Sequence, residues 1–229
     1  MALKKNRFIN LYVLCVLFIV ILCCLVVSCS LKENYTFDGI YSLEASAEGR
    51  LTSYGTCFYT NGKFVTNAHL VTYKLEDDKV FYDNIIAKDF RCEKKYSLTP
   101  SRVDYENDCC VLETSNYDGM SLECDKTYKP NIGDEIFSVG NLNNYGLAYG
   151  FGMITSETKM ISNLGIDIPY IQTNIEISGG CSGGPVFNYK HKVIGIMSMK
   201  LVNKYGESID GASFYVPISL IDIIWHNNV

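Results

Sequence analysis

The sequence lacks three patterns that would each suggest a different kind of protein. Its ten cysteines include no pair with C-x-x-C spacing, which argues against a zinc site. There is no basic stripe interleaved with aromatic residues, and 25 Asp and Glu outnumber 20 Lys and Arg, so binding to a phosphate backbone is not expected. Long helical periods are scarce. What remains is a globular composition, 48% hydrophobic over 229 residues, with room for one or two small cores.

The first 28 residues do not belong to the predicted globule. Three basic residues precede an almost unbroken apolar run at residues 11–27, the pattern of an export signal or membrane anchor. The run ends in V-V-S-C, which resembles a bacterial lipobox, so we predict cleavage before Cys29 and lipidation of this cysteine. An uncleaved transmembrane helix and a cleaved signal without lipid stay open as alternatives. All three place the globule outside the cytoplasm, in a bacterial cell envelope or secreted, and the first two tether it to a membrane.

The cysteines beyond the signal are ambiguous. An exported domain permits disulfides, and spacing alone assigns no connectivity. Several of these cysteines lie in apolar, strand-like runs, where a cysteine usually packs as a small hydrophobe. We therefore predict mostly free, buried thiols. The six residues concerned are Cys57, Cys92, Cys109, Cys110, Cys124 and Cys181.

Short strands dominate the predicted secondary structure. Runs at residues 56–60 and 63–66 flank Asn-Gly, which is a strong signal for a two-residue hairpin turn. A polar, turn-rich stretch at residues 115–131 is the predicted linker, and one capped helix is predicted at residues 219–227. The regular spacing of short strands favours a sandwich or barrel. Further strands are predicted at residues 134–139, 145–156, 170–173, 185–188, 192–199 and 212–216.

Three separated motifs together point to nucleophilic catalysis. G-C-S-G-G-P at residues 180–185 places a serine in a glycine-walled turn, but a serine is nucleophilic only if a base takes its proton. T-N-A-H, ending at His69, supplies a base, and N-D-C-C-V-L supplies Asp108 at the start of an apolar strand. The other two histidines, His191 and His226, lack a comparable setting.

Each residue of this set has a distinct predicted role. Ser182 attacks the scissile carbonyl, and His69 accepts its proton and later passes it to the leaving amine. Asp108 fixes the histidine tautomer and stabilises the imidazolium. The backbone amides of Gly180 and Ser182 form the oxyanion hole, and glycine at position 180 permits the backbone conformation that this requires.

Seven motifs in matching order resemble those of trypsin-like serine proteases, most closely the protease domain of bacterial HtrA-type enzymes. The resemblance covers about residues 55–219, and one such motif alone would be weak. The matching segments are T-N-A-H-L-V at 66–71, D-C-C-V-L at 108–112, G-N at 140–141, G-M-I-T-S at 152–156, I-Q-T-N at 171–174, V-I-G-I at 193–196 and F-Y-V-P at 214–217.

The resemblance implies an all-β fold of two orthogonal six-stranded antiparallel β-barrels with a C-terminal helix. It places the protease domain at residues 46–229, with one barrel at about 46–118, the second at about 130–218, and residues 29–45 as a preceding segment. It also implies a serine endopeptidase that acts on proteins or peptides, with the active site between the barrels. No metal or organic cofactor is implied.

The chain departs from the family in two places. Cys181 stands where trypsins carry an acid that pairs with a newly cut N-terminus, so this mode of activation is not expected. The sequence ends at Val229 without the PDZ domain usual in HtrA-type enzymes, so we do not expect their peptide-triggered regulation or trimer formation.

The primary specificity pocket has two readings. By family position, Glu176 lies at the base of the pocket, and Ser198, Met199 and Lys200 form one wall. The acid would then select Lys or Arg in the substrate. In the other reading, Glu176 pairs with Lys200 and closes the pocket.

Two assignments have rivals. Asp104 competes with Asp108, but it lacks the apolar strand that would bury and orient it. Cys181 competes with Ser182, because some viral relatives of this fold use a cysteine in G-x-C-G-G. In those proteins two glycines follow the cysteine directly, whereas here Ser182 follows Cys181, so we assign Ser182.

Two other functions stay open. Some trypsin-like domains have lost catalysis and act as binding or adhesion modules, and this chain would then be an inert module at the cell surface. The same triad also cleaves esters, so an esterase is the third alternative.

Overall fold

The computed structural model describes residues 14, 16–19, 36–48, 52–76, 78–163 and 166–221. The chain divides into two compact units, Met1–Thr36 and Phe37–Val229, and the strands of the described residues all lie in the second. Residues 14 and 16–19, in the predicted signal, are helical, whereas Cys29 lies outside the described residues. Within the described ranges, no helix has the length and apolar character that crossing a bilayer requires.

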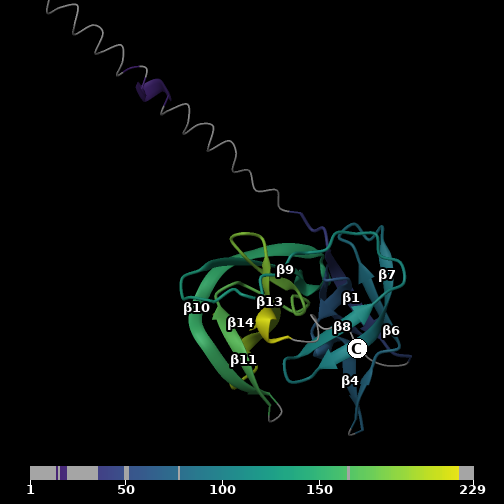
Figure 1. Ribbon diagram of the computed structural model, residues 1–229. Coiled ribbons are helices and arrows are strands. Elements are labelled where there is room, and N and C mark those ends of the chain that lie inside the picture. Colours follow the sequence, from purple (N-terminus) through teal and green to yellow (C-terminus); the bar gives the residue numbers. More distant parts are fainter. Residues whose placement is uncertain are drawn as a thin grey trace, which may run out of the picture. The chain divides into compact units, whose positions relative to one another are not determined.

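The second unit contains two closed antiparallel barrels of six strands each, which confirms the predicted fold class (Figure 1). The strands of the first barrel are β1 (Ile40–Ser46), β2 (Ser53–Thr60), β3 (Lys63–Thr66), β6 (Asn84–Lys88), β7 (Lys95–Asp104) and β8 (Cys109–Glu113). Those of the second are β9 (Glu135–Asn141), β10 (Leu147–Asn163), β11 (Ile166–Thr173), β12 (Pro185–Asn188), β13 (Val193–Val202) and β14 (Ser208–Pro217). Around the barrels the orders are β1-β2-β3-β8-β7-β6 and β10-β11-β14-β13-β12-β9.

The predicted hairpin connects β2 and β3. Asn61 and Gly62 have φ values of 49° and 79°, and positive φ at both central residues is what a type I′ turn requires. β3 then pairs with β8 in a register that sets Thr66 opposite Cys110. As a result, the end of β3, which leads to His69, lies beside the start of β8, which follows Asp108.

The first barrel begins earlier than the boundary placed at about residue 46. β1 belongs to it, and Leu43 and Ala45 are buried while Ser42 and Glu44 are partly exposed, the alternation of a half-buried strand. We did not predict β1, β6 or β7, nor the small sheet of β4 (Thr72–Leu75) and β5 (Asp78–Phe81). β6 has only five residues, and Pro100 interrupts β7, which weakens the sequence signal of these strands.

The predicted linker at residues 115–131 contacts both barrels. Leu122 forms an isolated bridge with Thr60 of β2, and Cys124 forms one with Val193 of β13. At the other end of the domain, the predicted helix at residues 219–227 begins where the structure has a 3-10 turn, η2 (Ile218–Leu220). Residues 222–229 lie outside the described residues.

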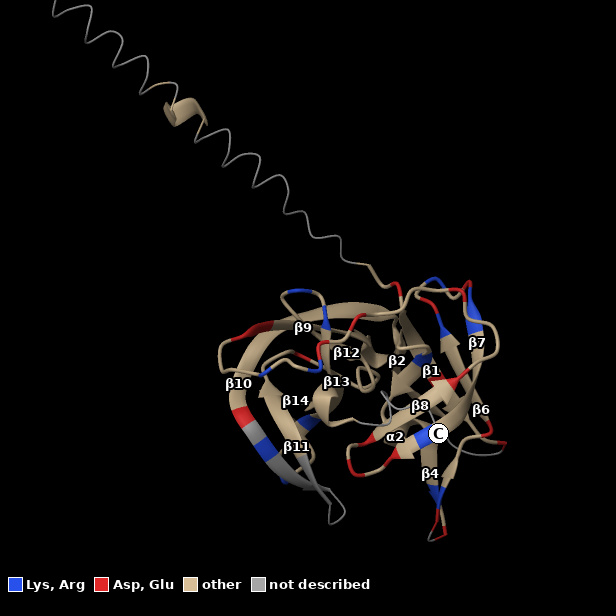
Figure 2. Ribbon diagram, viewed as in Figure 1, with Lys and Arg blue, Asp and Glu red and all other residues tan. Residues whose placement is uncertain are grey.

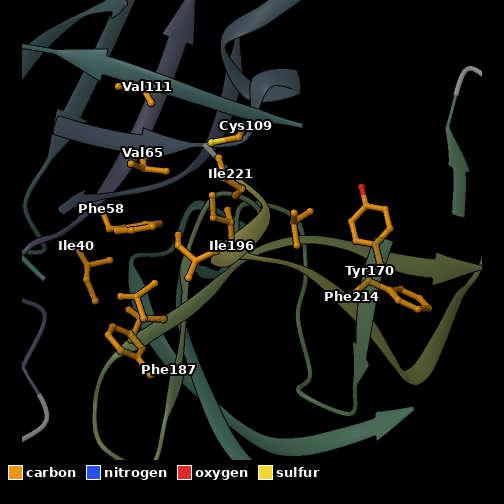
Figure 3. Packing of buried hydrophobic residues seen from close by; sticks show 14 of the residues in the cluster. Ile40, Phe58, Val65, Cys109, Val111, Tyr170, Phe187, Ile196, Phe214 and Ile221 are labelled. Carbon is orange, nitrogen blue, oxygen red and sulfur yellow. The ribbon is translucent and has the colours of Figure 1, made fainter. Parts of the chain in front are cut away.

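One apolar cluster joins the two barrels. Phe58 and Cys109 come from the first barrel, and Ile196 and Phe214 come from the second (Figure 3). Each of these side chains is at most 4% exposed, and burying a large apolar side chain contributes about 1.5–3 kcal/mol. The barrels are therefore packed against each other by the hydrophobic effect. The cluster comprises Ile40, Phe58, Val65, Cys109, Val111, Phe137, Val139, Tyr170, Phe187, Val193, Ile196, Phe214, Val216, Ile218 and Ile221.

Surface charge adds little to this packing. Figure 2 shows Lys and Arg interspersed with Asp and Glu over both barrels. Lys192, for example, pairs with Glu123 at 3.2 Å, with both side chains largely exposed. Exposed pairs of this kind contribute about 0–1 kcal/mol each, so apolar burial dominates the stability of the fold.

Candidate active site

His69 lies on a single turn of helix directly after β3. This turn, α2 (Ala68–Val71), buries its three other side chains, whereas 49% of the His69 side chain is exposed. Ahead of the turn, the side-chain amide of Asn67 donates to the backbone carbonyl of Asp108 at 2.9 Å, and the Ala68 N–H donates to the same oxygen at 3.1 Å. Burial and these hydrogen bonds together hold α2 against residue 108.

Asp108 binds His69 through both the backbone and the ring. Its Oδ1 accepts from the His69 backbone N–H at 3.0 Å, and its Oδ2 lies 2.7 Å from Nδ1 of the imidazole. In the neutral imidazole, donation from Nδ1–H to the carboxylate leaves Nε2 unprotonated and able to accept a proton. The predicted pairing of these two residues is thus present.

The electrostatics of His69 suit a proton acceptor. Partial burial of the imidazole lowers its pKa, but the hydrogen bond and the negative charge of Asp108 outweigh this effect and raise the pKa above its usual 6.5. A carboxylate that stabilises the imidazolium in this way makes the ring a stronger base. The cause of the shift is Asp108, which is 8% exposed.

Ser198 connects this pair to Ser182. The Ser198 hydroxyl donates to Oδ2 of Asp108 at 3.1 Å, and the Ser198 carbonyl accepts from Oγ of Ser182 at 2.7 Å. A hydrogen-bonded series therefore runs from His69 through Asp108 and Ser198 to Ser182. Within the described part of the chain, no hydrogen bond joins Ser182 directly to His69. The sequence motifs place Ser198 only in the wall of the pocket.

The turn around Ser182 accepts only glycine at two positions. Gly180 and Gly183 have φ values of 91° and 83°. A Cβ at Gly180 would lie 2.1 Å from the Asn141 carbonyl oxygen, and one at Gly183 would lie 2.1 Å from the Thr56 oxygen. In the described residues, no protein acceptor binds the backbone N–H of Gly180 or Ser182. These two amides are free to bind an oxyanion.

Thr56 of β2 ties this turn to the first barrel. Its Oγ1 donates to the Gly180 carbonyl at 2.7 Å and accepts from the Asn141 N–H at 2.8 Å. Its backbone N–H donates to the Ser182 carbonyl at 2.9 Å. The sequence contains no signal for this role, because a threonine in an apolar strand usually only packs.

Cys181 points into the second barrel. The thiol is buried, its side chain packs against Gly140 of β9, and burial raises its pKa. A thiol with a raised pKa stays protonated at neutral pH and is a weak nucleophile. These features disfavour the reading of Cys181 as the nucleophile. The six cysteines beyond the signal are all free, and Cys92 is the exposed one among them.

The rival acid and the other histidines lie elsewhere. Asp104 accepts hydrogen bonds from the backbone and side chain of Asn107 at 3.0 and 2.8 Å, so it stabilises the turn before β8. His191 occupies the turn between β12 and β13 and packs edge-on against Phe137. His226 lies outside the described residues.

Two of the residues predicted to line the pocket, Glu176 and Lys200, form an ion-pair cluster with Asp210. Nζ of Lys200 lies 2.9 Å from Oε2 of Glu176 and 3.2 Å from Oδ1 of Asp210. Met199 is partly buried against the cluster that joins the barrels. Of the two readings of Glu176, pairing with Lys200 is the one that the structure shows.

Two closed barrels, with a His–Asp pair on the first and a Gly-Cys-Ser-Gly-Gly turn on the second, define the class of trypsin-like peptidase folds. The family model described as "Trypsin-like peptidase domain" matches residues 55–196. The chain belongs to this family.

Its relatives include HtrA-type proteases, as the sequence motifs predicted. A probable periplasmic serine endoprotease, DegP-like, of Hahella chejuensis is 26% identical over 82% of this chain and 37% of its own length. The mitochondrial serine protease HTRA2 of Drosophila ananassae is 27% identical over 86% of this chain and 43% of its own. The present chain thus spans less than half the length of these two relatives.

Solved structures share the fold. The HtrA-type protease AlgW with a tripeptide superimposes with a TM-score of 0.69 and 23% identity, covering 82% of this chain and 60% of its own. A serine endoprotease from Yersinia pestis has a TM-score of 0.62 and 20% identity, covering 80% of this chain and 59% of its own.

Proposed function

We propose that this chain is an exported serine endopeptidase that hydrolyses peptide bonds through an acyl-enzyme. The hydrogen-bonded series His69–Asp108–Ser198–Ser182, beside a turn with two free amides, is the observation that carries the proposal. Its relatives are named serine proteases, and AlgW was solved with peptides. We infer protein or peptide substrates from the same names.

The first step activates Ser182. Its hydroxyl donates to the Ser198 carbonyl, so rotation about the Cα–Cβ bond must redirect it toward Nε2 of His69. As Oγ attacks the substrate carbonyl carbon, the proton passes to Nε2, and Asp108 stabilises the imidazolium through Nδ1–H.

The turn then stabilises the charge that develops on the substrate oxygen. The amides of Gly180 and Ser182 donate to this oxyanion, and losing one such donor typically costs on the order of 3 kcal/mol of transition-state stabilisation. His69 delivers its proton to the leaving amine, and the acyl group stays on Ser182. Water, deprotonated by His69, hydrolyses this ester and restores the hydroxyl.

The substrate side chain before the cleaved bond, P1, binds in our proposal beside Glu176, Ser198, Met199 and Lys200. Their positions support this: the carbonyl of Ser198 contacts Ser182, and β13 continues from Ser198 to Lys200. Glu176 lies in the segment that leads to the oxyanion turn, residues 180–183, and its side chain contacts Lys200.

We also propose that the protease domain acts outside the cytoplasm and is held at a membrane by lipid on Cys29. The basic start, the apolar run at residues 11–27 and the V-V-S-C sequence support export and lipidation. The name of the Hahella relative places that protein in the periplasm.

A fluorophosphonate probe tests the enzyme directly, because it labels only an activated serine. We expect labelling and casein cleavage by the unmodified protein, and their loss in Ser182→Ala with kcat/KM reduced by about 10⁴-fold or more. Cys181→Ala is the matched control in the same turn, and it should still be labelled. Activity that survives Ser182→Ala but not Cys181→Ala would instead make the cysteine the nucleophile.

The second candidate is a binding module without catalysis. It is favoured by one observation, the donation of the Ser182 hydroxyl to the Ser198 carbonyl rather than to His69. Absence of labelling in folded protein would support this candidate. Casein and a simple ester assayed side by side would separate a peptidase from an esterase.

A further inference from the structure

Three charged side chains meet at the P1 side of the proposed site. Lys200 in β13 binds Glu176, which precedes the oxyanion turn, and Asp210 in β14, at 2.9 and 3.2 Å. Oε1 of Glu176 accepts from the backbone N–H of Gly211 at 3.2 Å. Both oxygens of Glu176 are therefore engaged within the protein.

The Lys200 side chain is the least exposed member of this cluster. It is 15% exposed, whereas Glu176 and Asp210 are 64% and 90% exposed, so the lysine stem lies beneath its two partners. Lys200 is two residues beyond Ser198, whose carbonyl contacts the Ser182 hydroxyl. The aliphatic stem of Lys200 thus reaches from β13 to the segment that precedes the oxyanion turn.

The charge of the cluster depends on this one cation. With Lys200, two carboxylates and one ammonium leave a single net negative charge, and without it both carboxylates stand unopposed. The hydrogen bonds that Lys200 donates to Glu176 and Asp210 raise the pKa of its ammonium group, which therefore stays charged at neutral pH. Both carboxylates are open to solvent, and ion pairs screened in this way contribute only about 0–1 kcal/mol, so the lysine acts here chiefly by its volume and charge and not by stabilising the fold.

We propose that Lys200 is a specificity-determining residue that masks the charges of Glu176 and Asp210, so that the enzyme rejects Lys and Arg at P1. This inference rests on the proposed peptidase function. Removing the lysine frees the volume of its side chain and leaves two carboxylates without a cation, which turns the pocket into a receptor for cations. Basic specificity is therefore latent in this chain and suppressed by its own lysine.

Peptide substrates that differ only at P1 test the inference. For Lys200→Ala we expect kcat/KM for Arg relative to Ala at P1 to rise at least about 10-fold over the unmodified protein. Lys200→Met, which keeps the stem volume without the charge, should give a smaller rise. In Lys200→Ala combined with Glu176→Gln the gain should largely disappear. Lys204→Ala, the same charge change at a lysine that lies over the Tyr205 ring, should leave the ratio unchanged.

Binding of benzamidine, a small cation, reads the pocket without catalysis. By NMR titration of the Ser182→Ala protein, we expect at least about 10-fold tighter binding after Lys200→Ala, and reversal by Glu176→Gln. If this binding pattern holds while no variant cleaves peptides, the masking role stands and the peptidase proposal fails. If peptides are cleaved but neither the P1 ratio nor benzamidine binding responds to Lys200→Ala, the masking role is refuted.

Discussion

Single residues of the site adopt backbone conformations that most residues avoid. Asp108 has φ of 47°, a left-handed conformation that is uncommon for a residue other than glycine. Such a conformation costs on the order of 1–3 kcal/mol and persists where the surroundings hold it. Here Asn67 and Ala68 bind its carbonyl, while His69 and Ser198 bind its carboxylate. The hydrogen bonds that orient His69 also offset the strain at Asp108.

The titration of His69 is the first test of this arrangement. In the Ser182→Ala background, NMR of the imidazole C–H signals should give a pKa above 6.5, because Asp108 raises it. Activity of the unmodified enzyme should accordingly fall as the pH drops through this value, since protonated His69 cannot act as a base. The free energy of unfolding depends on pH in the opposite direction from activity. The His69–Asp108 pair stabilises the fold below pH 6.5, about the pKa of an unfolded histidine, and this stabilisation is lost as the pH rises through the higher pKa of the folded protein.

Asp108→Asn provides the control. Without the carboxylate only burial remains, and burial lowers the pKa, so the titration midpoint should move below that of the parent protein. The variant should also lose activity by about 10⁴-fold, since the histidine tautomer is no longer fixed. An unchanged midpoint would show that Asp108 does not set the proton affinity of His69.

Among the secondary-structure elements, β2 contributes more than its sequence suggests. It forms one side of the first barrel, and through Thr56 it also positions the oxyanion turn that leads into the second barrel. The strand is therefore both a scaffold and a part of the site. This follows from the closure of two barrels against each other, which brings β2 beside Gly180.

Replacing Thr56 by Val separates the two roles of the strand. The side chain keeps its shape but loses its bonds to Gly180 and Asn141, so we expect kcat to fall about 10- to 100-fold, with a stability loss of about 1 kcal/mol. Thr60→Val is the matched control, because Thr60 is also buried in β2 and donates to a backbone carbonyl, that of Leu122, at 2.8 Å. It should lose similar stability with little change in kcat. Equal kcat in both variants would remove the positioning role of Thr56.

Over the whole molecule, the site depends on both barrels at once. His69 and Asp108 belong to the first barrel, and Ser182 and Ser198 belong to the second. The apolar cluster that joins the barrels keeps these four residues together. Mutations in that cluster should therefore affect activity as well as stability.

The proposed anchor gives the last prediction. Mass spectrometry of the mature protein from a bacterial membrane fraction should find Cys29 as the first residue, carrying a diacylglyceryl group. Cys29→Ser should abolish the lipid and release the protein or leave it unprocessed. An intact N-terminal methionine would favour the uncleaved membrane helix, and an unmodified new N-terminus would favour secretion.

Local patterns in the sequence predicted a large part of this molecule. The Asn61-Gly62 turn, most strands of the second barrel, and the three motifs that hold the proposed catalytic residues depend on residues within a few positions of one another, and such short-range preferences can be read directly. The strands β6 and β7 escaped because β6 has only five residues and Pro100 interrupts the pattern of β7. The alternation in β1 could have been read from the sequence in the same way as that of the predicted strands.

Contacts between distant segments could be decided only by the folded chain. Thr56 binds Gly180, Ser198 bridges Asp108 and Ser182, and Lys200 pairs with Glu176 because barrel closure brings together segments far apart in the sequence. A threonine, a serine or a lysine in a strand is compatible with many environments. Which of these environments each residue has is decided by its neighbours across the barrels. Those neighbours lie far away in the sequence, so no local pattern contains them.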